Sequence, residues 1–194
     1  MKTFSIRPTV TLRGRTFKGL RGWSGKPFHP PLTDVPIAAY LLAAGFDIAS
    51  VVGGSGSAWA EELWHAGTYT LLTGVVVSVF AALTGLMDAK HSSQAGTQAR
   101  RTINTHATVM ITVTTLAIAD LVWRLNAFHT RQFTPIGIVV LAVVIALLVS
   151  VGSAFGGTLV YDYGFNVETA GDSPVFHTSE TDVLPGQHQK GASS

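Results

Sequence analysis

Four long apolar stretches dominate the pattern of hydrophobic and polar positions along the chain. They cover approximately Val35–Gly53, Leu63–Met87, Ile103–Trp123 and Ile136–Val160. A bilayer core about 30 Å thick needs roughly 20 apolar residues in a helix that rises 1.5 Å per residue. None of the stretches alternates like a membrane β-strand, and each is too long for one. Because hydrocarbon leaves no water to pair with the backbone, the pattern predicts four transmembrane α-helices.

Short polar connections between the stretches predict an all-α, integral membrane four-helix bundle with up-down-up-down connectivity. Thr33 and Asp34 stand directly before the first stretch, so Asp34 is predicted to cap the first helix. No internal repeat is evident. The chain is divided into a basic N-terminal segment (1–33), a four-helix transmembrane domain (34–161) and a polar tail (162–194).

Small residues and hydroxyls predict how the helices meet. Gly152 and Gly156 form a GxxxG pattern on the fourth stretch, which is typical of close helix contact in lipid. Four threonines spaced three or four apart lie on one face of the third stretch, namely Thr105, Thr108, Thr112 and Thr115. This face favours helix packing, with a polar permeation path as the alternative.

Charge is scarce and unevenly distributed. Only 12% of the residues are charged, against about 25% in soluble domains. Of the 13 Lys and Arg residues, all except Arg124 and Arg131 fall on the side that holds both termini. Lys and Arg are retained in the cytoplasm, so we predict a multi-pass protein of the bacterial cytoplasmic (inner) membrane with both termini cytoplasmic. The expected partners are the lipid bilayer and other membrane subunits, without nucleic acid.

Ionisable residues at membrane depth are candidate functional sites. The chain order brings His29, Asp34, Asp88 and His106 to the cytoplasmic end of the bundle. Imidazole and carboxylate together suit a divalent metal, a proton-handling pair or a structural hydrogen bond, and the spacing does not choose among these. We expect Asp88 or Asp34 to lie within hydrogen-bond reach of His106.

A second polar layer is predicted at the opposite end. It contains Asp47, His65, Asp120 and Arg124. Asp120 and Arg124 lie four residues apart on one helix and can form an ion pair. Asp47 is expected to bond to a neighbouring helix or to pair with Arg124.

Haem is an open alternative for the polar layers. Because the chain has no cysteine, c-type attachment and iron–sulfur clusters are excluded. A b-type haem with two axial histidines needs them at one depth. His65 and His106 should differ by roughly 20 Å in depth, so haem would require His29 or His91 together with His106, or a single ligand.

Three motifs together resemble a known family. The first runs from Gly22 to Ile37 and includes His29-Pro30-Pro31-Leu32 followed by Pro36-Ile37; the others are Leu83–Asp88 and Phe155–Tyr161. Over about residues 20–168 the chain is similar to a bacterial family of four-helix membrane proteins of unknown function with an HP-x-L-x-x-x-PI opening. Some members of that family are fused to Rieske-type domains, which implies a redox setting.

These observations favour a non-catalytic integral membrane subunit or scaffold, accessory to a redox or respiratory complex. No catalytic residue is assigned. Two alternatives remain open. One is a haem- or metal-binding membrane redox protein that uses the cytoplasmic His and Asp residues. The other is a small transporter or proton carrier, although no broken helix is evident.

The charge distribution makes a prediction about topology. A reporter fused after Ser194 should be active in the cytoplasm, and one inserted between Ala127 and Phe133 should be active outside it. Paired enzymatic reporters in whole cells measure this, and the reverse pattern would overturn the orientation.

Overall fold

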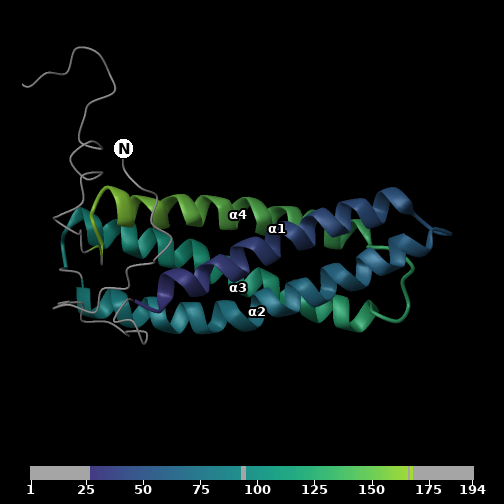
Figure 1. Ribbon diagram of the computed structural model, residues 1–194, viewed down its shortest axis with the longest axis horizontal. Helices are drawn as coiled ribbons and strands as arrows, with labels where there is room; N and C mark the ends of the chain where they lie inside the picture. The colour runs from purple at the N-terminus through teal and green to yellow at the C-terminus, as the bar shows by residue number, and fades with distance from the viewer. Residues whose placement is uncertain (1–26, 93–94, 166, 168–194) are drawn as a thin grey trace, which may run out of the picture.

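Helices account for nearly all of the protein's described structure. The computed structural model describes residues 27–92, 95–165 and 167. These residues form α1 (His29–Gly53), α2 (Ala58–Ser92), α3 (Gln98–Ala127) and α4 (Ile136–Tyr161), shown in Figure 1. All four are long and apolar enough to cross a membrane. The prediction of an all-α protein with four membrane spans is therefore confirmed.

The start of α1 differs from the expectation. The helix begins at His29, before the two prolines, and not next to Asp34. Proline fits the first turn because its missing N–H would have no partner there. The Thr33 hydroxyl donates to the Pro30 carbonyl at 2.7 Å. Asp34 thus lies exposed within α1, and its predicted role as helix cap is wrong.

Most of the two predicted terminal segments, 1–33 and 162–194, falls outside the described residues, as does the side chain of His91. The orientation of the chain in the membrane stays a prediction. We therefore name the two ends of the bundle by residues. The Arg124 end holds the α1–α2 and α3–α4 connections, and the His106 end holds the α2–α3 connection (Figure 1).

The helices form two hairpins that pack side by side. α1 packs against α2 and α4, and α3 packs against α4 and α2. α1 and α3 consequently occupy opposite corners of the bundle. The α1–α2 turn is tight: Gly54 and Gly56 adopt φ values of 63° and 98°, which side chains with a Cβ rarely take.

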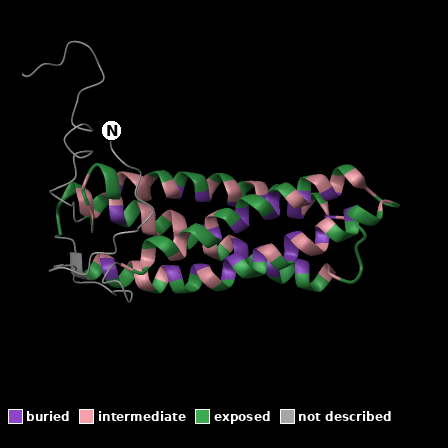
Figure 2. Cartoon of the chain, viewed as in Figure 1, coloured by how far each residue is buried: buried purple, intermediate pink, exposed green. Residues whose placement is uncertain are grey.

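An apolar core runs along the middle of the bundle, and Figure 2 shows buried positions turned inward and exposed ones outward on each helix. The outward positions are largely apolar too, as expected for surfaces that face lipid. Tyr40 reaches across the core and donates from its hydroxyl to Ser78 at 3.0 Å. The core residues are Tyr40, Ala43, Leu71, Val75, Val113, Ala117, Leu121, Ile145 and Val149.

Glycines allow the helices to approach closely. A Cβ at Gly74 of α2 would lie 2.8 Å from Cε1 of Tyr40 and 2.9 Å from Cβ of Ala39. A Cβ at Gly152 of α4 would overlap the sulfur of Met110 on α3. Both glycines of the predicted GxxxG pattern face α3, since Gly156 lies against His106.

Replacement of Gly74 by leucine should force α1 and α2 apart and lower the free energy of unfolding by about 1–3 kcal/mol. Denaturant titration in detergent micelles measures it. Gly45→Leu is the matched control, because a Cβ there meets nothing within 4 Å. Equal stability of the two variants would contradict the packing described.

Candidate functional site

The Arg124 end contains a buried ion pair between helices at opposite corners of the bundle. Nη1 of Arg124 donates to Oδ1 of Asp47 at 2.9 Å, and Nη2 donates to Oδ2 of the same carboxylate. Nη2 also donates to Oδ2 of Asp120 at 3.2 Å, and Nε lies 3.2 Å from Asp120 Oδ1. All three residues have an exposed fraction of 0%. The Asp47–Arg124 and Asp120–Arg124 contacts inferred from the sequence both exist.

Neighbouring polar groups complete this cluster. The Thr134 hydroxyl donates to Asp47 Oδ1 at 3.1 Å, and the Thr134 N–H donates to the Ser50 hydroxyl at 3.0 Å. Ser50 in turn donates to the Ala60 carbonyl at 2.7 Å. These bonds connect α1 to the start of α2 and to Thr134. Thr134 directly precedes Pro135, the N-cap residue of α4.

An aromatic ring covers the charged cluster. The guanidinium carbon of Arg124 lies 5.4 Å from the ring centre of Trp64, a cation–π contact. Trp64 is fully buried, and its Nε1 donates to the Phe128 carbonyl at 3.3 Å. The buried indole therefore shields the guanidinium inside the bundle.

The cluster joins the two hairpins and offers no opening for a substrate. Its charges bond to one another, its hydroxyls bond to backbone or carboxylate, and its surface is closed. Gly67 leaves room for the Asp47 carboxylate, because a Cβ at this position would lie 3.1 Å from Asp47 Oδ1. We assign it a structural role.

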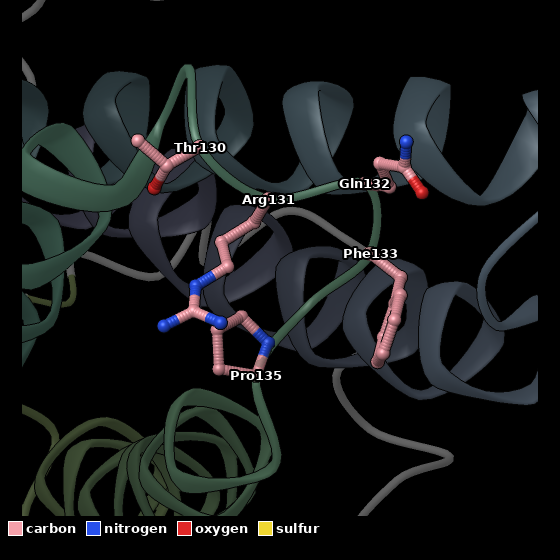
Figure 3. A pocket seen from close by; sticks show the side chains of 5 residues that line it. All are labelled: Thr130, Arg131, Gln132, Phe133 and Pro135. Atoms are coloured by element: carbon pink, nitrogen blue, oxygen red, sulfur yellow. The ribbon is translucent and has the colours of Figure 1, made fainter.

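A hollow of about 280 Å³ lies beside this end, in the α3–α4 connection. Figure 3 shows its lining, with the Arg131 side chain extending over Pro135. Arg131 is the one ionisable residue among those that line it, which are Thr130, Arg131, Gln132, Phe133 and Pro135. The polar side chains of Thr130, Arg131 and Gln132 point in different directions (Figure 3), whereas a binding pocket has polar groups that converge, so we do not place the functional site here.

The His106 end holds a pair of histidines on α1 and α3. The ring centres of His29 and His106 lie 6.5 Å apart, with an angle of 81° between the ring planes. Nδ1 of His29 lies 2.8 Å from the Ala81 carbonyl, and Nδ1 of His106 lies 2.8 Å from the Gly152 carbonyl. Both rings are partly buried.

These contacts define the chemistry of the two rings. A carbonyl oxygen can only accept, so each Nδ1 carries a proton and donates it. In the neutral ring Nε2 then holds the free electron pair. A backbone carbonyl on Nδ1 is also the usual outer partner of a metal-bound histidine. The two imidazoles are thus held in the tautomer that can ligate through Nε2.

Comparison with protein families gives one match, over residues 25–169, to a model described as predicted membrane protein (DUF2231). The chain belongs to the DUF2231 family. The family description gives membrane location without an activity. Comparison with curated proteins and with solved structures gives no match.

In this DUF2231 protein the structure brings together two of the four residues predicted at the His106 end. His29 and His106 approach each other, whereas Asp34 is exposed on α1. Asp88 is buried on α2. The hydrogen bond observed at His106 goes to a backbone carbonyl and not to the expected carboxylate.

No group of three or more His, Asp or Glu within residues 27–92, 95–165 and 167 is arranged to hold a metal ion. A metal site formed by His29, Asp34, Asp88 and His106 remains a prediction from the sequence.

The remaining predicted residue, His65, is separate from both sites. Its ring stacks on Phe128 at 4.4 Å between ring centres. The sequence reasoning missed Ser50, Trp64 and Thr134 as members of the ionic cluster, because hydroxyl and aromatic residues near helix ends have many possible roles.

The ionic cluster predicts a large effect of removing one charge. Arg124→Gln should lower the free energy of unfolding by about 3–5 kcal/mol, because Asp47 and Asp120 are then buried without a cation. Asp47→Asn should cost less, because Arg124 keeps Asp120 as a partner. Denaturant titration in micelles measures this, and Arg131→Gln in the exposed connection is the control. The double variant should lose less than the sum of the single losses. Single losses below about 1 kcal/mol would contradict the structural role.

Proposed function

We propose that this chain is a non-catalytic integral membrane subunit that holds a b-type haem between His29 and His106 and carries electrons. The site would lie at the cytoplasmic end of a bundle in the bacterial inner membrane. One observation carries the proposal: the imidazoles of His29 and His106, on helices at opposite corners, have ring centres 6.5 Å apart, a separation that suits one metal atom between them.

The separation can be compared with coordination chemistry. A metal–imidazole bond is about 2 Å long and a ring nitrogen lies about 1.1 Å from its ring centre, so two imidazoles in line on one metal have centres roughly 6.2 Å apart. The observed 6.5 Å agrees. The angle of 81° between the planes is compatible, because each ring can rotate about its own bond to the metal.

The chain itself positions the two imidazole rings. Each ring is fixed by its Nδ1–H bond to a carbonyl of the next helix, Ala81 for His29 and Gly152 for His106. Such bonds orient a ligand and increase its basicity. Haem, when bound, supplies one-electron chemistry, and its potential depends on these bonds and on burial.

Two histidines are sufficient for haem, because the porphyrin supplies the other four ligands. A bare divalent ion needs about four ligands from protein or water, and the described residues supply two imidazoles. Haem therefore makes better use of the ligands available.

The transport alternative has less support. Each threonine of the α3 face is exposed and donates to the carbonyl four residues earlier, as in the 2.9 Å bond from Thr112 to Thr108. Hydroxyls bonded within their own helix on a lipid-facing surface do not line a path through the bundle.

Purified full-length protein in mild detergent should show the spectrum of a low-spin b-type haem at about one haem per chain. His29→Ala and His106→Ala should each abolish the low-spin spectrum and lower haem content about tenfold or more. His65→Ala is the matched control, since His65 lies within a span but outside the pair. A wild-type protein without haem, or low-spin haem retained in both variants, would contradict the proposal.

A further inference from the structure

The two hairpins repeat one pattern of buried positions. Five buried residues of α1 have buried counterparts 77 positions later in α3. The pairs are Pro36 and Val113, Tyr40 and Ala117, Ala43 and Asp120, Ala44 and Leu121, and Asp47 and Arg124. The side chains differ in chemistry, but the faces turned inward coincide.

α2 and α4 repeat in the same way, at a separation of 71 positions. Each of the seven buried residues of α4 has a buried counterpart in α2. The pairs are Gly67 and Ile138, Thr68 and Val139, Leu71 and Ala142, Gly74 and Ile145, Ser78 and Val149, Ala81 and Gly152, and Asp88 and Leu159. The bundle therefore consists of two equivalent hairpins.

The repeat includes the candidate haem ligands. His106 follows His29 by 77 positions, and the carbonyl that anchors it, Gly152, follows Ala81 by 71. Glycines stand one helical turn after both carbonyls, at Gly85 and Gly156, also 71 apart. Each hairpin thus supplies one imidazole, one carbonyl and one glycine.

Equivalent residues also meet one another in space. His29 contacts His106, and Asp47 bonds to Arg124. In a pair of units related by a two-fold rotation, equivalent side chains can touch only on the axis. Both contacts thus mark an approximate two-fold axis that runs along the bundle and through the candidate site.

The two glycines lie against the histidine rings. A Cβ at Gly85 would lie 2.7 Å from Cε1 and 2.9 Å from Nδ1 of His29. A Cβ at Gly156 would lie 3.2 Å from Cε1 of His106. Any larger residue at Gly85 must move the ring from its carbonyl. Alanine stabilises a helix interior more than glycine does, so glycine here has a steric reason.

We propose that Gly85 and Gly156 are equivalent positioning residues of a haem site centred on the internal two-fold axis. Each sets the place of one axial imidazole by leaving room for its ring over the carbonyl one turn earlier. This inference rests on the proposed function and extends it to residues that do not touch the metal.

Carbon monoxide binding to the reduced full-length protein tests the inference, because a haem with two firmly held imidazoles has no free position. Wild type should not bind carbon monoxide. Gly85→Ala should bind it and lose most of its low-spin absorbance, and Gly156→Ala should do so to a smaller extent. Gly157→Ala is the control on α4, since a Cβ there meets only Tyr161, at 3.9 Å.

The possible failures are distinguishable. A wild type without haem overturns the proposed function and the glycine roles together. A low-spin wild type with Gly85→Ala equally inert to carbon monoxide overturns the glycine roles alone. If Gly85→Ala does not accumulate as a folded protein, Gly156→Ala decides, because its contact is looser: carbon monoxide binding supports the inference, and its absence overturns it.

Discussion

The buried ion pair between Asp47 and Arg124 is the interaction on which the bundle depends. Inside hydrocarbon a lone charge is expensive, so each of these two side chains requires the other. They come from helices at opposite corners that make no close backbone contact, and the pair therefore draws the two hairpins together through the centre. Asp120, Thr134 and Trp64 hold the guanidinium and carboxylate in one arrangement. Small residues permit the close approach; this pair specifies which positions meet.

The ion pair also sets the relative depth of His29 and His106 at the other end of the bundle. Asp47 follows His29 by 18 residues, and Arg124 follows His106 by 18. A helix of that length spans about 27 Å, and both helices are continuous over it. Once the two charges meet, the two histidines are brought to the same depth on the same axis. The histidine pair is in this way positioned by a contact far from it, and its rings are fixed by carbonyls of α2 and α4.

The sequence predicted the four spans because hydrocarbon imposes a length and an apolar composition that few other structures meet. It also predicted the Asp120–Arg124 contact, which follows from spacing on one helix. It missed the start of α1, because His29 precedes two prolines and was placed outside the helix. The acceptors of the histidines were missed as well, since every residue carries a carbonyl and the sequence does not identify which one a ring will reach. The repeat was not visible because most of its partners, such as Tyr40 and Ala117, share burial and not chemistry.

Electron paramagnetic resonance of the oxidised, full-length protein at low temperature tests most directly whether His29 and His106 ligate one haem in the orientation seen here. Two imidazoles on one ferric iron give a low-spin signal, and planes close to the observed 81° make that signal strongly anisotropic. We expect such a signal, with a single dominant feature at low field. A high-spin ferric signal, the rhombic low-spin signal of parallel rings, or a protein without haem would contradict it.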